Sequence, residues 1–103
     1  MKKRKNSIRV RSPFEIAEAL GLDKEDAIAM EFRARLNVKI IELVKKNGLT
    51  HKEVAKRAGA SRTRVTAILN GHTMGISTDF LLRIIYSLGV RTAPTFYPIG
   101  LAA

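Results

Sequence analysis

Residues 49–71 read LTHKEVAKRAGASRTRVTAILNG, and this stretch decides the fold. Thr50 and Glu53 have the spacing of a capping box, in which both side chains satisfy backbone N–H groups at the start of a helix. That helix is expected to end at Gly59, because glycine adopts the positive φ of a sharp turn at little cost. Ser61 is then placed to cap a second short helix.

Two short helices joined by about three residues that include a glycine are typical of a helix-turn-helix. Ala55 lies where the second helix is expected to cross the first, and its small side chain lets the two helices approach. Val54, Val65 and Ile68 are expected to point inward and to fix the crossing angle. At least five positions of this motif, at fixed offsets, therefore carry compatible residues.

The side chains left outside on the second helix suit DNA, because the first residues of a recognition helix meet base edges in the major groove. An arginine there can bind O6 and N7 of guanine, and hydroxyl or methyl groups can meet a base edge or a thymine methyl. We expect base contacts from Ser61, Arg62, Thr63, Thr66 and Ala67. Phosphate contacts are expected from His51, Lys52, Lys56, Arg57, Arg64 and Asn70.

Positive charge is concentrated in two places in a chain whose formal net charge is +10. Residues 1–11 contain six bases and no acid, and residues 45–72 contain seven bases beside a single acid, Glu53. A purely structural helix pair has no need of this asymmetry, so it favours a polyanionic partner. The basic arm, residues 1–11, is either a solvated tail or adds affinity by reaching phosphates or the minor groove.

Hydrophobic periodicity and capping signals predict three further helices. The sequence SPFE at 12–15 begins a short helix that runs to about residue 20. A long helix follows over about 24–46, and its excess of apolar residues makes it either the centre of a bundle or a contact with a second subunit. The residues at 77–79 cap a last helix over 80–88.

The C-terminal tail is rich in residues that favour β-structure, but Pro94 and Pro98 each remove a backbone donor. Any strand there must be an edge strand or a short dimer contact. The predicted organisation is therefore a flexible basic arm at 1–11, a helix-turn-helix domain at 12–91 and an extension at 92–103.

Several other functional classes are disfavoured by composition. The chain has no cysteine, which removes disulfides and thiolate sites and fits a cytoplasmic protein. No apolar run approaches the roughly 20 residues that span a bilayer. His51 and His72 stand at opposite ends of the motif with no nucleophile–base grouping nearby, so we expect no catalysis, metal or cofactor. Residues 45–72 contain no Phe, Tyr or Trp, which disfavours binding of single-stranded RNA by stacking.

The motif at 50–71 resembles that of the Xre, or Cro/C1-type, transcriptional regulators. The resemblance extends over about 12–91 to a subgroup similar to HigA-type antitoxins. It rests on the run PFEIAEALGL, on the acid-rich start of the long helix, and on the block ISTDFLLRIIYSLG at 76–89. His51 stands where that family often has a glutamine that touches phosphate and braces the recognition helix.

The resemblance implies an all-α, λ-repressor-like bundle of about five helices. It also implies a homodimer that binds a palindromic operator in double-stranded DNA, often at its own promoter. For antitoxin members it further implies a RelE-like ribonuclease toxin as partner. The alternatives are a stand-alone regulator without a toxin, or a protein-interaction module whose DNA affinity is incidental.

Overall fold

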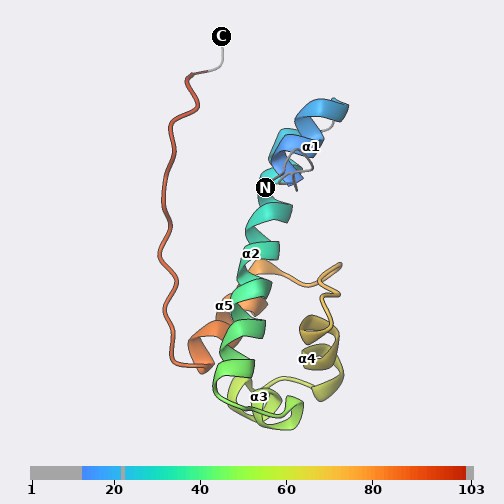
Figure 1. Ribbon diagram of the computed structural model, residues 1–103, viewed down its shortest axis with the longest axis vertical. Helices are drawn as coiled ribbons and strands as arrows, with labels where there is room; N and C mark the ends of the chain where they lie inside the picture. The colour runs from blue at the N-terminus through green and yellow to red at the C-terminus, as the bar shows by residue number, and fades with distance from the viewer. Residues whose placement is uncertain (1–12, 22, 102–103) are drawn as a thin grey trace, which may run out of the picture.

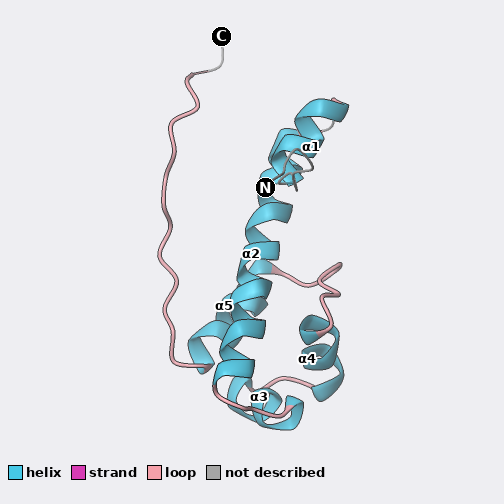
Figure 2. Cartoon of the chain, in the orientation of Figure 1, coloured by secondary structure: helices cyan, strands magenta, loops and turns pink. Residues whose placement is uncertain are grey.

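The computed structural model describes residues 13–21 and 23–101, and helices make up most of this length. The elements are α1 (Pro13–Leu20), α2 (Lys24–Lys46), α3 (His51–Ala58), α4 (Arg62–Leu69) and α5 (Thr78–Ser87), arranged as in Figure 1. The described residues contain no strand (Figure 2). The predicted all-helical fold of about five helices is thereby confirmed.

The long helix α2 is the element on which the others pack. Its C-terminal half contacts α4 and α5, whereas α1 packs against its N-terminal half (Figure 1). Leu36, Ile40 and Val44 of α2 are buried accordingly. In the N-terminal half, by contrast, Ile28 and Phe32 are 47% and 40% exposed. The helix is thus central to the bundle over its second half only, and its first half forms with α1 a projecting hairpin that we call the α1–α2 arm.

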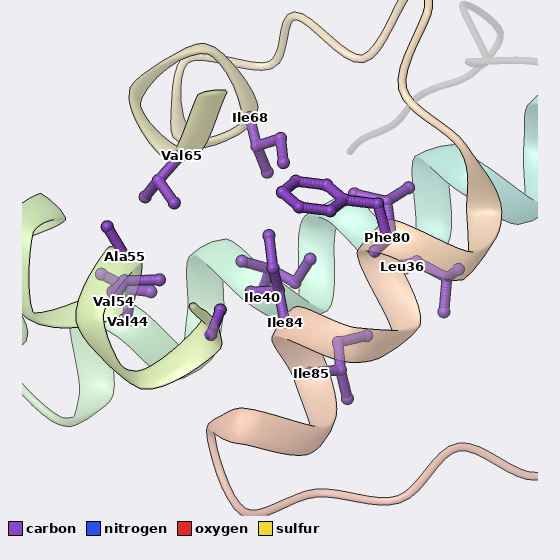
Figure 3. Packing of buried hydrophobic residues seen from close by; sticks show 12 residues of the cluster. Leu36, Ile40, Val44, Val54, Ala55, Val65, Ile68, Phe80, Ile84 and Ile85 are labelled. Atoms are coloured by element: carbon purple, nitrogen blue, oxygen red, sulfur yellow. The ribbon is translucent and has the colours of Figure 1, made fainter. Parts of the chain in front are cut away.

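The hydrophobic core lies between the C-terminal half of α2 and the three short helices. Figure 3 shows side chains of α4 and α5 meeting those of α2 and α3. The buried cluster comprises Leu36, Ile40, Val44, Val54, Ala55, Ala58, Val65, Ile68, Phe80, Leu81, Ile84 and Ile85. Burying a side chain of the Val, Leu, Ile or Phe type contributes roughly 1.5–3 kcal/mol. This shared cluster is what holds α3 and α4 in a fixed orientation.

Helices α2, α3 and α5 each begin directly after a residue whose side chain caps the helix. The Asp23 carboxylate accepts a hydrogen bond from the Glu25 N–H at 2.9 Å, and Thr50 and Glu53 form the complete capping box of α3. Ser77 caps α5 directly by accepting from the Phe80 N–H at 3.1 Å. Consequently α5 begins at Thr78, two residues before the predicted start.

The C-terminal segment leaves α5 and runs beside α2 in an extended conformation (Figure 1). Residues 90–101 form no strand, since Pro94 and Pro98 lack the N–H that a ladder requires and no neighbouring strand is present among the described residues. Phe96, Tyr97, Ile99 and Leu101 are all highly exposed. The basic arm at 1–11 and the capping role of Ser12 lie outside the described residues.

Within the described chain, no helix combines the length and the apolar character that crossing a membrane demands.

Replacing Ile84 by alanine tests the core. Ile84 is fully buried, so Ile84→Ala removes packed atoms and leaves a cavity that costs about 2–5 kcal/mol. Urea unfolding followed by circular dichroism measures this change. Ile99→Ala is the matched control, because Ile99 is 84% exposed and its truncation is expected to stay within about 0.5 kcal/mol. Equal effects of the two substitutions would contradict the described core.

Candidate nucleic-acid interface

The turn between α3 and α4 is built from backbone hydrogen bonds. Gly59 ends α3 with φ 64°, in the left-handed region where a side chain is strained. The Ala60 N–H donates to the Ala55 carbonyl at 2.9 Å, and the Gly59 N–H donates to the Lys56 carbonyl at 3.3 Å. These bonds satisfy the carbonyls at the end of α3 and redirect the chain into α4.

Packing fixes which side of α4 faces outward. Val65 and Ile68 are buried in the core, and Val54 and Ala55 of α3 are buried in the same cluster (Figure 3). The predicted inward set is therefore confirmed. The opposite face of α4 is left in solvent.

The N-terminal turn of α4 carries the exposed polar side chains. Ser61, Arg62, Thr63 and Arg64 are all exposed, and the Ser61 hydroxyl accepts from the Arg64 N–H at 3.2 Å. Thr66 and Ala67, which were predicted to share this surface, are only half-exposed. The first turn is thus the most accessible part of the predicted base-reading surface.

A histidine–threonine contact joins the two helices. Nδ1 of His51, at the start of α3, lies 2.9 Å from Oγ1 of Thr66 in α4. The hydroxyl can donate to a neutral nitrogen or accept from N–H, so either tautomer supports the bond. His51 therefore braces α4, which is the role that the resemblance assigns to a glutamine at this position.

A second contact joins α4 to α5 through an aromatic ring. The guanidinium carbon of Arg64 lies 3.9 Å from the centroid of the Phe80 ring, and that of Arg83 lies 5.1 Å from the same centroid. Arg83 also donates to the Gly59 carbonyl at 3.4 Å. Sequence reasoning did not single out Phe80 or Arg83 for this site, because nothing in the local sequence reveals that α5 lies beside α4.

The helices that form this site lie within a stretch of sequence that matches a known protein family. A family model described as a helix-turn-helix domain matches residues 16–93. The chain belongs to this helix-turn-helix family. Comparisons with curated proteins and with solved structures found no match. The matched range includes all of α2 to α5, and membership supports a DNA-binding regulator.

A basic rim surrounds the exposed turn of the helix-turn-helix. Lys52, Lys56 and Arg57 are exposed on α3, Lys45 and Lys46 are exposed at the end of α2, and Asn70 is exposed after α4. In the described part of the chain, ion pairs join Lys24 to Glu18 and Lys39 to Glu42, all on α1 and α2. The cations of the rim form no such pair among these residues, so they are available to phosphates.

The one acid of the helix-turn-helix is committed to its cap. Glu53 accepts from the Thr50 N–H at 2.8 Å, and this backbone bond, together with the bond to the Thr50 side chain, lowers the pKa of Glu53. The ionised carboxylate therefore favours the folded state. Its contribution to the free energy of unfolding is complete above the ordinary pKa of 4.5, and it is lost as the pH falls through the lowered pKa.

No group of three or more metal-ligating side chains occurs within the ranges that the structure describes. His51 and His72 therefore do not form such a group with the nearby acids.

The brace is tested by a double-mutant cycle of His51→Ala and Thr66→Val. If the two side chains are bonded, their effects on the free energy of unfolding are non-additive, with a coupling of about 0.5–1.5 kcal/mol. Urea unfolding of the four proteins measures it. His72→Ala combined with Thr66→Val is the control, because His72 is exposed and its side chain forms no hydrogen bond with Thr66. Additive effects in the His51 cycle would contradict the brace.

Proposed function

We propose that the protein is a sequence-specific transcriptional repressor that places α4 in the major groove of double-stranded DNA. The observation that carries this proposal is the exposed first turn of α4, which presents Arg62 and Thr63 within a rim of unpaired basic side chains. A short helix with an arginine and hydroxyls at its N-terminal end suits base recognition. The surrounding lysines supply the sequence-independent part of the affinity.

The residue roles follow from position and exposure. We assign base recognition to Ser61, Arg62 and Thr63, with Thr66 and Ala67 contributing at the edge of the contact. Thr66 is engaged by His51, so its methyl group is the part that remains to meet a base. Phosphate contacts are assigned to His51, Lys52, Lys56, Arg57, Arg64 and Asn70. Residues 1–11 would add affinity outside this core contact.

We further infer that two copies bind together on a palindromic operator. One helix of eight residues contacts a short half-site, and paired half-sites match a two-fold symmetric dimer. The α1–α2 arm offers a surface for a second copy, since Ile16 and Leu20 of α1 and Ile28, Met30 and Phe32 of α2 are all at least 40% exposed. Several large apolar side chains exposed on one projecting hairpin favour an interaction surface.

A narrower form of the proposal makes the protein the antitoxin of a toxin–antitoxin pair that controls its own operon. The resemblance of the layout at 12–91 to HigA-type antitoxins supports it, and the partner would be a RelE-like ribonuclease. Co-expression with the product of an adjacent short ribonuclease-like gene tests it. Relief of growth arrest together with co-purification supports the antitoxin role, and persistence of the arrest favours a stand-alone regulator.

Selection of bound duplexes from a random pool tests the dimer. We expect enriched sequences to contain two inverted half-sites whose centres lie about one helical turn, or 10–10.5 base pairs, apart. The spacing follows from two α4 helices entering successive major grooves on one side of the duplex. Enrichment of a single, unrepeated half-site would contradict the dimer while leaving α4 as the reading element.

Substitutions at two exposed basic residues separate base reading from phosphate binding. Arg62→Ala is expected to cost about 1–3 kcal/mol on the selected operator and to relax the preference at one base pair. Lys56→Ala should weaken binding to all sequences alike and reduce the salt slope by about one. Fluorescence anisotropy on the operator and on single-base variants measures both. Unchanged base preference in Arg62→Ala would show that α4 is misplaced.

A further inference from the structure

Two arginines from different helices meet at one aromatic ring. Arg64 comes from the first turn of α4, Arg83 comes from α5, and both guanidinium groups lie against Phe80. Because both distances are measured to the same centroid, the two guanidinium carbons are at most about 9 Å apart. Phe80 itself is only 6% exposed and belongs to the core cluster. The platform that holds the two cations is therefore fixed by the packing of the whole domain.

The positive charge of this pair is not neutralised locally. Neither arginine forms an ion pair with an acid in the described ranges, where the ion pairs lie on α1 and α2. Both arginines are exposed. The ring attracts each guanidinium through its negative face but adds no net charge. Two like charges held close together on an exposed surface favour an anion between or above them.

We propose that Arg64 and Arg83, positioned by Phe80, form a phosphate clamp that holds the DNA backbone beside the recognition helix. The clamp rests on the proposed DNA binding and adds Arg83 as a contact and Phe80 as a positioning residue. A guanidinium presents a rigid fork of donors that matches phosphate oxygens. Successive phosphates of one strand advance by only about 3.4 Å along the duplex axis. Two guanidinium groups at most about 9 Å apart are therefore close enough to bind one phosphate or two neighbouring ones.

Preorganisation is the physical advantage of this arrangement. A free arginine side chain loses much of its rotamer entropy when it binds a phosphate. Here the stacking on Phe80 restrains Arg64, and the bond to the Gly59 carbonyl restrains Arg83 before DNA arrives. Less entropy is then lost on binding, which raises the affinity. The clamp also ties the turn of the helix-turn-helix to α5, so the phosphate contact is fixed relative to α4.

The rival explanation is that Arg83 serves only the fold, through its bond to Gly59. The substitution Arg83→Lys separates the two roles, because lysine keeps the positive charge but lacks the guanidinium Nη2 that donates to the Gly59 carbonyl. The clamp predicts that Arg83→Lys keeps the salt slope of the parent protein, whereas Arg83→Ala lowers it by about one. A purely structural role predicts that Arg83→Lys and Arg83→Ala weaken binding alike, and this result would overturn the clamp.

The experiment measures binding of the full chain to a 24-base-pair duplex pool of random sequence over a series of salt concentrations. Arg83→Ala is expected to weaken binding roughly tenfold at low salt, the loss of one charge-assisted contact, and to reduce the salt slope by about one. The matched control is Arg35→Ala, which removes the same charge from the groove between α2 and the C-terminal segment. Figure 1 shows that segment and α4 on opposite sides of α2. Equal slopes in Arg83→Ala and Arg35→Ala would refute the clamp.

A double-mutant cycle tests whether the two arginines act together. The effects of Arg64→Ala and Arg83→Ala on the affinity for the same pool should be non-additive, because each arginine contributes less to phosphate binding when the other is absent. Phe80→Leu, which keeps an apolar side chain in the core, should reduce the effect of both substitutions. The arginine cycle touches no buried side chain, so it decides the matter even if Phe80→Leu fails to fold. Additive effects would assign the arginines to independent contacts and contradict a shared clamp.

The possible outcomes distinguish a failure of the clamp from a failure of the proposed DNA binding. If the parent protein fails to bind any duplex, the proposed function itself is wrong. If the parent binds and Lys56→Ala lowers the salt slope while Arg83→Ala does not, DNA binding stands and the clamp alone is wrong.

Discussion

The burial of Val65 and Ile68 in the shared core determines which side chains of α4 face solvent. A helix of eight residues is too short to be stable in water by itself, so its conformation and its rotation about its axis come from tertiary packing. Ile40 and Ile84, both fully buried, supply that packing from α2 and α5. Once these side chains are in place, the first turn of α4 has only one face that it can present to a partner.

The start and end of most helices were predictable because their signals are local. The caps at Thr50 and Ser61 bond to backbone groups only three residues away, and the glycine at the α3–α4 turn also acts within a few residues. The inward set of the helix-turn-helix was predictable for the same reason, since helical spacing determines which residues share a face. The early start of α5 shows the limit, because Ser77, Thr78 and Asp79 are all residue types that cap helices, and the local sequence does not show which of them does so.

The contacts that set the electrostatics of the site were not predictable in this way. The pairing of His51 with Thr66 spans fifteen residues, and the contact of Arg83 with Gly59 spans twenty-four. Both depend on how helices that are distant in sequence come to lie beside one another. The sequence identified Arg64 as a basic residue near the site, but its stacking on Phe80 follows only from the apposition of α4 and α5.

The unbroken course of α2 gives the molecule a mechanical property. With 23 residues at about 1.5 Å each, the helix is about 35 Å long and joins the core to the tip of the α1–α2 arm without a flexible joint. A body attached at the tip would therefore turn together with α4 as one rigid unit. Lengthening α2 by one residue would rotate that body by about 100° about the helix axis, since a turn holds 3.6 residues. The length of α2 thus sets the relative orientation of a partner bound at the tip of the α1–α2 arm and a partner bound by α4.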